Sequence, residues 1–362
     1  MSRKTGRRLF WVVCLALCLA GFLLSVLTGP VKTTPGDLLR FIQSHDRVQA
    51  AIFIDLRLSR AVLAFLVGAA LALSGAILQG YFRNPMADPF VVGVSSGASL
   101  GAVIAVSLGF EAAAFGFSGP GLLAFISGLG IVSLVYVLSL RRGGFKIETI
   151  LLTGIAAGAL ASAFTSFFLF MRSDSYDQAV FWLLGSFQLA EWRQAATIAP
   201  WFVLCFVAAI WLARDMDLLA LGDETAQALG CPVRRVRKTF LAMSALLAAL
   251  SVAVSGIIGF VGLVVPHWVR ILIGPGHRAL FASSALAGGT FPFIATSWPA
   301  TSSPPSSPSA SSPQPSAPRS SFICYIKNVK PRMGTRTGST CPRIGRRSLE
   351  GGHALKGLYR AL

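Results

Sequence analysis

Long apolar stretches alternate with short polar segments along most of the chain. They lie at residues 9–29, 60–80, 90–108, 117–140, 149–171, 195–213, 239–257, 259–274 and 280–294. Most approach the roughly 20 residues that a helix needs to cross the hydrocarbon core of a bilayer, but the last is too short to cross it unaided. The pattern predicts an all-α polytopic membrane protein with about eight or nine transmembrane helices, whose transmembrane domain is residues 1–294.

The distribution of basic residues predicts how these helices are oriented. If the chain alternates sides, the inside segments hold 15 Lys/Arg and the outside segments hold 7. Because positive residues collect on the cytoplasmic side, we predict a multi-pass membrane protein with a cytoplasmic N-terminus. The outside loop that ends near residue 60 is unusual, because it holds five of those seven charges.

Composition narrows the function classes. Hydrophobic residues make up 54% of the chain, charged residues make up 13%, and the formal net charge is +18. Most of the basic residues before the tail lie in loops beside apolar stretches, so we expect a lipid bilayer as partner and no nucleic acid. The chain has no GxxxxGK[ST] or HExxH motif, and its six cysteines lack metal-binding spacing. We therefore expect no enzymatic activity, no bound cofactor and no metal.

A protein of this kind that moves its cargo uphill needs an energy source. Ion-coupled transporters usually carry ionisable residues within their membrane helices, and these stretches hold almost none. This favours an external motor over a proton relay. A secondary transporter or channel that works alone is the alternative.

The loop after the sixth apolar stretch predicts a short helix of about two turns. Asp223 is placed to cap its start, and Glu224 complements the positive end of the helix dipole. Gly230 is a natural C-terminal stop. Ala226 and Leu229 are expected on one face. A short capped helix in a cytoplasmic loop is suited to docking a partner, although an ordinary amphipathic loop helix has the same spacing.

The segment RNPMADPFVVGVSSGASLGA interrupts the apolar pattern with charge and two prolines. We expect Arg83-Asn84-Pro85 to end one helix at the cytoplasmic side and Gly93 to Gly97 to start the next. The glycines would allow close packing of that helix against its neighbours.

A second irregular segment is VSGIIGFVGLVVPHWVRILIGPGHR. Gly256, Gly259 and Gly262 recur every three residues, and Pro266-His267 is expected to break the regular helix. Irregular backbone at membrane depth is tolerated where it is buried in protein or lines a cavity, so this segment predicts part of a pathway.

Three blocks in order give the chain a specific resemblance. They are RLSRAVLAFLVGAALALSGAILQGYFRNPMADPFVVGVSSGASLGA, LGDETAQALG and SGIIGFVGLVVPHWVRILIGPGHR. Residues from about 9 to 291 resemble the FecCD-like permeases of binding-protein-dependent ABC importers for iron chelates, heme and vitamin B12. The resemblance implies a multi-pass subunit of the bacterial inner membrane with ten spans. It makes an iron chelate of the siderophore type the leading cargo, with heme or vitamin B12 as alternatives.

The resemblance also implies partners and sites. Separate cytoplasmic ATPase subunits, which use ATP, would dock on Gly222, Asp223, Glu224, Ala226, Leu229 and Gly230. A periplasmic binding protein would contact Arg57 and Arg60, which would explain the basic outer loop. A second permease subunit, identical or similar, would complete the pathway at the subunit interface. The pathway and gate residues would be Arg83, Asn84, Pro85, Gly93, Gly97, Gly259, Gly262, Pro266 and His267.

The tail, residues 295–362, departs from this pattern. Between Ser297 and Ser321, 18 of 25 residues are Ser or Pro, and a basic stretch follows. Such a composition predicts disorder. Codons can be chosen for 295–304 and 313–325 so that the shifted frame spells sequence that looks like the ending of the resembled family. We therefore predict a reading-frame change near residues 291–295, and poor assembly if it is real.

Overall fold

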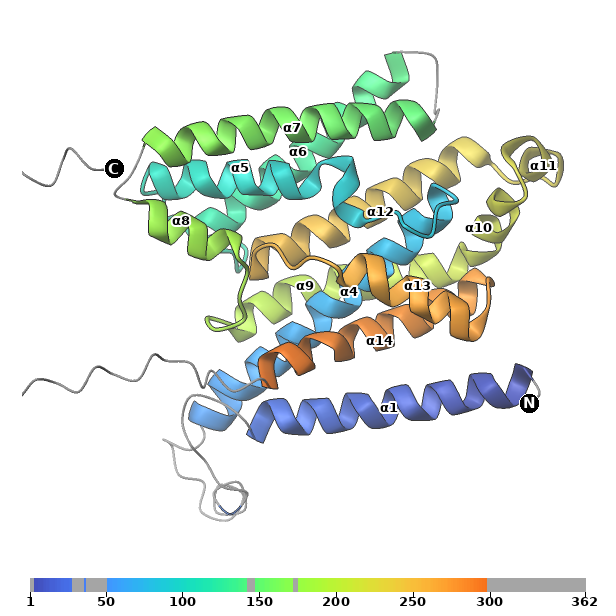
Figure 1. Cartoon of the computed structure of the whole chain (residues 1–362), viewed down its shortest axis with the longest axis horizontal. Coiled ribbons are helices and arrows are strands. Elements are labelled where there is room, and N and C mark those ends of the chain that lie inside the picture. The colour runs from blue at the N-terminus through green and yellow to red at the C-terminus, as the bar shows by residue number, and fades with distance from the viewer. Residues whose placement is uncertain (1–2, 28–35, 37–50, 142–146, 172–174, 298–362) are drawn as a thin grey trace, which may run out of the picture. The chain divides into compact units, whose positions relative to one another are not determined.

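The computed structural model describes residues 3–27, 36, 51–141, 147–171 and 175–297 of the 362-residue chain. Within these residues the regular elements are helices (Figure 1). They are α1 (Arg3–Leu27), η1 (Ala51–Leu58), α4 (Ser59–Tyr81), η2 (Pro89–Val92), α5 (Val94–Ser107), α6 (Gly119–Arg141), α7 (Ile147–Met171), α8 (Tyr176–Leu183), α9 (Trp192–Trp211), α10 (Ala213–Ala220), α11 (Asp223–Ala228), α12 (Val233–Ser255), α13 (Val261–Ile273) and α14 (His277–Ser297).

The apolar stretches form helices close to their predicted bounds, which confirms the all-α polytopic membrane class. Six of the described helices are long and apolar enough to cross a membrane. α5 and α13 are apolar but have only 14 and 13 residues. Each is therefore about 20 Å long, less than the roughly 30 Å of a hydrocarbon core. The predicted tail lies outside the described residues from residue 298 onward.

α4 is the central helix of the bundle and packs against α14, α12, α13 and α9. Small residues permit this close packing. A Cβ added to Gly68 would collide with the carbonyl oxygen of Gly288, and one added to Gly75 would collide with that of Gly262. The hydroxyls of Ser74 and Ser244 are 2.8 Å apart and share a buried hydrogen bond between α4 and α12. Close backbone approach and polar contacts of this kind hold helices together in lipid.

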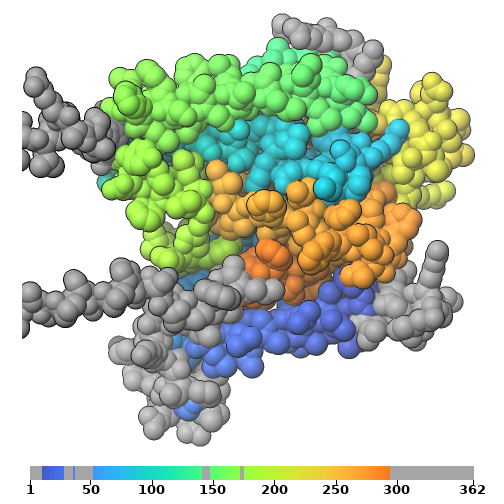
Figure 2. Space-filling model, viewed as in Figure 1, coloured from blue at the N-terminus to red at the C-terminus, as the bar shows by residue number. Residues whose placement is uncertain are grey.

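Other helices keep a wide apolar surface exposed. On α7 the side chains of Leu160 and Phe167 are 61% and 55% exposed, which suits a surface that lipid covers. α1 lies along one edge of the face seen in Figure 2 and packs on α14. There the rings of Phe22 and Phe293 meet edge to face with centroids 6.0 Å apart.

One end of the bundle, which we call the α11 end, gathers the segments that were predicted to share a side of the membrane. α10 and α11 lie there, with the last turns of α4 and α6 and the first turns of α1, α7 and α14 (Figure 1). α10 and α11 project from the bundle in Figure 2. The arrangement agrees with the alternation of sides read from the sequence. The cytoplasmic placement of this end stays a prediction.

Candidate functional site

α11 is the short helix that the sequence predicts, but its start differs from the prediction. Gly222, with φ of +121°, is the N-cap residue, and no side chain caps the helix. The prediction that Asp223 is the cap is wrong, because Asp223 is the first helical residue, followed by Glu224. At the other end Leu229 is the C-cap, and Gly230 follows with φ of +85°. The predicted stop is confirmed, since glycine adopts this left-handed conformation without a steric cost.

The two apolar residues expected on one face of α11 point in different directions. Ala226 is fully buried in the main core, whereas the Leu229 side chain is 59% exposed. The helix ends at Ala228, so Leu229 leaves the helical register and the expectation of a shared face is wrong. Leu221, just before the helix, is 64% exposed. The exposed apolar groups at α11 are therefore Leu221 and Leu229, and Ala226 anchors the helix.

The carboxylate of Asp223 joins three elements. It forms an ion pair with Arg83, which follows α4, and a second one at 2.7 Å with Arg237 of α12. Arg237 is only 2% exposed, and its guanidinium lies 5.1 Å from the centroid of the Tyr81 ring at the end of α4. Breaking such a contact would leave a buried charge without its partner, which is costly. A movement of α11 would therefore also move the end of α4 and the start of α12.

A groove of about 510 Å³ runs beside α11. Arg83, Asp223 and Arg237 lie in its wall, with Ile147 and Glu148 at the start of α7. The groove therefore brings together the ends of three membrane helices, α4, α7 and α12, and the short helix α11. Its wall carries charges of both signs, a surface that suits a protein partner with complementary charges.

The segment 83–93 breaks the chain between α4 and α5, as predicted. Arg83 has φ of +50°, which is uncommon for a residue other than glycine. The Asn84 side chain accepts a hydrogen bond of 2.9 Å from the backbone N–H of Met86. Asp88 caps η2 by accepting from the N–H of Phe90 at 2.7 Å. Burial raises the pKa of Asp88, and that hydrogen bond offsets part of the rise. The side chains of Asn84 and Asp88 thus stabilise the backbone of this turn.

The two glycines of this segment pack against α6. Gly93 is the N-cap of α5 with φ of +92°. A Cβ on Gly93 or Gly97 would lie 2.8 Å or 2.7 Å from the side chain of Ile131. Gly97 also receives a hydrogen bond of 2.7 Å at its carbonyl oxygen from the Ser127 hydroxyl. Within this subunit both glycines therefore serve helix packing, and their role at a gate stays a prediction.

The second irregular segment breaks earlier than predicted. Pro266 lies inside α13, so the expectation that Pro266-His267 ends a regular helix is wrong. The break is at 256–260, where Gly256 has φ of +71° and Phe260 has φ of +67°. Proline is tolerated in a membrane helix when neighbours satisfy the freed backbone group. Here the carbonyl of Gly262, four residues before the proline, lies against α4.

The structure brings the two irregular segments together. A Cβ on Gly262 would meet the ring of Pro89, whereas one on Gly259 would meet nothing within 4 Å. Pro85 lies with Arg83 in the wall of a cavity near the end of α4. His267 is half-buried, and its Nδ1 is buried without a hydrogen-bond partner among the described residues. Gly262 therefore serves packing, and Gly259 faces open space.

The prediction that Arg57 contacts a partner protein is wrong, because this side chain is buried within the chain itself. Its side chain is 3% exposed and donates to the carbonyl oxygens of Val26 and Leu27, at 2.8 Å and 3.0 Å. These carbonyls belong to the last turn of α1, and carbonyls in the last turn of a helix have no N–H partner within that helix. Arg57 therefore caps α1. Arg60 is half-buried, and its contact with a partner stays a prediction.

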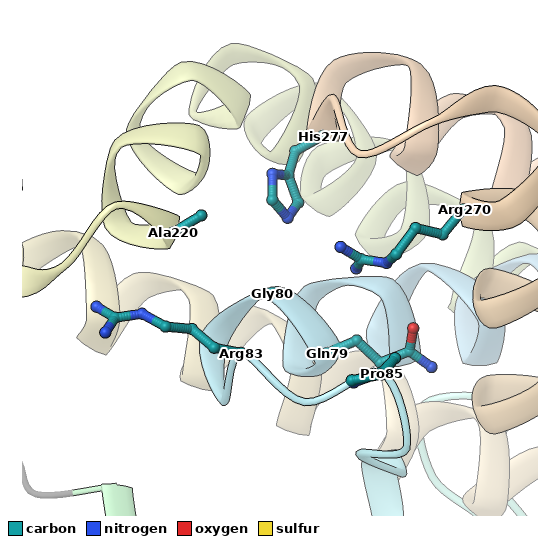
Figure 3. A pocket seen from close by; sticks show the side chains of 7 residues that line it. All are labelled: Gln79, Gly80, Arg83, Pro85, Ala220, Arg270 and His277. Atoms are coloured by element: carbon teal, nitrogen blue, oxygen red, sulfur yellow. The ribbon is translucent and has the colours of Figure 1, made fainter.

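Sequence reasoning missed a second group of residues at the α11 end. Asp217 of α10 accepts hydrogen bonds from Nδ1 and the backbone N–H of His277, at 2.6 Å and 3.0 Å. Burial alone would raise the pKa of Asp217, but these hydrogen bonds and the nearby imidazole lower it below its usual value. His277 borders a cavity of about 230 Å³ (Figure 3). Only the position of His277 at a helix start could have indicated the contact.

Comparisons with known proteins agree with this architecture. The model of the FecCD transport family matches residues 17–306 of this chain. The cobalamin import system permease protein BtuC of Halobacterium salinarum is 42% identical over 242 residues. That match covers 65% of this chain and 63% of the relative, so the chain spans less than two thirds of that protein.

Two further proteins are similar over a larger share of their length. The hemin transport system permease protein HmuU of Yersinia pestis is 40% identical over 248 residues, which are 66% of this chain and 71% of that protein. A solved structure of a metal-chelate type ABC transporter in an inward-facing conformation is 29% identical, with a TM-score of 0.69. It covers 82% of this chain and 90% of the neighbour.

Proposed function

Because the chain belongs to the FecCD transport family, we propose that it is the membrane permease of an ABC importer that moves an iron chelate of the siderophore type into the cell. The energy comes from a separate ATPase subunit, and a periplasmic binding protein delivers the cargo. The observation that carries the proposal is the ion-pair cluster of Asp223, Arg83 and Arg237, because it links a projecting helix to the ends of two central membrane helices.

Docking of the ATPase begins at the exposed apolar residues beside α11. Leu221 and Leu229 are 64% and 59% exposed, and a partner that covers them gains roughly 1.5–3 kcal/mol for each fully buried leucine. When the ATPase moves α11, Asp223 pulls on Arg83, and the turn that follows α4 moves with it. The chain's own part in transport is this mechanical link together with the lining of the pathway.

The pathway is completed by a second permease subunit, identical or similar. α13 supports this arrangement, because Trp268, Ile271 and Leu272 are each more than 60% exposed. They project from a helix too short to cross the membrane alone. The protein lies in a bacterial inner membrane, and its α11 end faces the cytoplasm.

The proposed cargo has two close alternatives. Relatives are named for cobalamin and hemin import, which makes both molecules specific alternatives to the iron chelate. All three are metal chelates. Proteoliposomes that contain the permease, its ATPase and its binding protein would be tested with iron-labelled siderophore, heme and cobalt-labelled cobalamin. ATP-dependent uptake of the siderophore alone is the expected result, and uptake of heme or cobalamin instead would reassign the cargo.

Docking is tested separately by co-purification of the ATPase with full-length permease. Leu229→Asp is expected to lower the amount of bound ATPase at least about tenfold, since a charge replaces a buried apolar contact. Leu189→Asp is the matched control, because Leu189 is 88% exposed and lies before α9, at the opposite end of the bundle. Equal loss in both variants, or loss in neither, would contradict docking at α11.

A further inference from the structure

α10 is joined to the start of α14 by a contact that the proposed docking does not use. The Asp217 carboxylate accepts hydrogen bonds from Nδ1 of His277 at 2.6 Å and from the backbone N–H of the same residue at 3.0 Å. His277 is the first residue of α14, and the first N–H groups of a helix have no partner within that helix. Asp217 therefore caps α14 from a different element.

This contact does not depend on the charge of the imidazole ring. Burial alone would raise the pKa of Asp217, but its hydrogen bonds with His277 lower it below its usual value. The carboxylate is therefore ionised at neutral pH and can only accept hydrogen bonds. Nδ1 then carries the donated proton in the neutral ring as in the charged one. The His277 side chain is 4% exposed, which keeps the imidazole side of this contact away from water.

The end of α4 lies against the same contact. A Cβ added to Gly80 would lie 2.8 Å from Nε2 of His277 and 2.9 Å from Sδ of Met216 (Figure 3). Met216 precedes Asp217 in α10 and is fully buried. Side chains of α10 and α14 thus meet at a position of α4 where a larger residue would push them apart. We call Gly80, Met216, Asp217 and His277 the α10 cluster.

The connection between α13 and α14 leaves the start of α14 free to move relative to α13. It is the tripeptide Gly274-Pro275-Gly276. Gly274 has φ of +103°, and a Cβ added to either glycine would meet nothing within 4 Å among the described residues. Short segments at the ends of elements act as hinges when they absorb backbone rotation. α14 is held more firmly to α4, where a Cβ on Gly68 would collide with the carbonyl oxygen of Gly288.

We propose that the α10 cluster is a second mechanical link in transport, in which Asp217 and His277 are positioning residues that make α14 follow the ATPase. The inference rests on the proposed function, because it needs an ATPase that moves α11. α10 moves with α11, since only Leu221 and Gly222 separate the two helices. Asp223 passes the movement to the ends of α4 and α12, and Asp217 passes it to α14. The hinge at 274–276 lets α13 stay in place.

The link is tested in proteoliposomes that contain the full-length permease, its ATPase and its binding protein, with the cargo that the wild-type complex transports. Asp217→Ala removes both hydrogen bonds to His277. We expect it to lower cargo uptake per ATP hydrolysed at least about threefold. The amount of ATPase that co-purifies should change less than about twofold, because Asp217 lies outside the docking surface.

Asp215→Ala is the matched control, because it removes the same charge from the same helix and leaves the contact with His277 intact. Its uptake per ATP hydrolysed should stay within about twofold of wild type. Equal losses in the two variants, or no loss with Asp217→Ala, would overturn the proposal.

A purely structural role of Asp217 gives a different result. Uptake, ATP hydrolysis and bound ATPase would then fall together, and the ratio of uptake to hydrolysis would stay constant, which would overturn the proposal. A wild-type permease that binds no ATPase would refute the proposed function itself, and the link with it. The two failures are therefore distinguished by the co-purification measurement.

Variants of His277 test the link from the other side, and they keep it testable if Asp217→Ala does not fold. His277→Ala should lower uptake per ATP hydrolysed, whereas His277→Asn keeps a side-chain N–H donor and should restore most of the ratio. The double variant Asp217→Ala with His277→Ala should lose no more than Asp217→Ala alone, since both residues act through one contact. Additive losses, or no rescue by asparagine, would contradict the assignment.

Discussion

The most apolar stretches of α9 and α12 have the same mean hydropathy, yet the two helices occupy different environments. Of the apolar span of α12, 78% is buried inside the protein, whereas 22% of that of α9 is buried. Hydropathy identifies both as membrane helices but does not distinguish a helix that faces protein from one that faces lipid. The difference lies in small and polar residues. α12 meets α4 through Ser244, and α9 exposes Trp201 and Val207.

The largest effect is expected where two central helices touch through glycines. Gly75→Ala in α4 would push a Cβ into the carbonyl oxygen of Gly262. We expect a loss of about 1–3 kcal/mol of stability, because overpacking forces the backbones apart. Gly130→Ala in α6 is the control, since its Cβ would meet nothing within 4 Å. Thermal unfolding in detergent would measure both, and equal melting temperatures would contradict the close packing of α4 and α13.

The next effect concerns the buried arginine of α12. Arg237→Gln removes the ion pair to Asp223 and the contact with the Tyr81 ring. We expect a loss of about 1–3 kcal/mol, limited because Asp223 is 47% exposed and water can solvate it. Arg235→Gln, at an exposed position of the same helix, should stay within about 0.5 kcal/mol. If both variants unfold alike, Arg237 is not the link between α11 and α12.

A smaller effect separates buried from exposed serines. Ser74→Ala removes the hydrogen bond to Ser244 between two central helices, and we expect a cost of about 0.5–1.5 kcal/mol. Ser166→Ala on α7 removes only an exposed bond to the carbonyl of Ser162 in its own helix, and its cost should be close to zero. The double variant Ser74→Ala with Ser244→Ala should cost less than the sum of the single variants. Additive costs would show that the two hydroxyls do not interact.

The smallest effect is the pH dependence due to Asp217. Its pKa is lowered in the folded protein, so its contribution is present above the unfolded value of about 3.9 and is lost as pH falls through the folded value. The carboxylate is 48% exposed, which limits the contribution to less than about 1 kcal/mol. Asp217→Asn should be less stable than wild type at pH 6, and the difference should shrink at the acid end. A constant difference would exclude the carboxylate as its cause.

The sequence predicted the parts of the fold that depend on local pattern. The nine apolar stretches, the break after Tyr81 and the stop at Gly230 follow from apolar length, proline and glycine, which act within a few residues. α8 and α10 were not predicted, because neither is long enough or apolar enough to be read as a membrane span.

The errors share one physical cause, which is that partners distant in sequence decide a local feature. Asp223 has the chemistry of a helix cap, but two arginines from other elements hold its carboxylate. Pro266 should end a helix, but packing against α4 lets the helix continue. Arg57 resembles a surface charge for a partner, yet it serves α1. The spacing of residues that are close in sequence does not indicate any of these contacts.

The contact between α1 and α14 has a consequence for the order of synthesis. The ribosome makes Phe22 first, and its ring partner Phe293 about 270 residues later. α1 is only 11% buried over its apolar span, so the nascent helix is stable in lipid while it waits. The bundle closes only when α14 has been inserted. A reading-frame change upstream of α14 would therefore leave the oldest helix in the membrane without its neighbour.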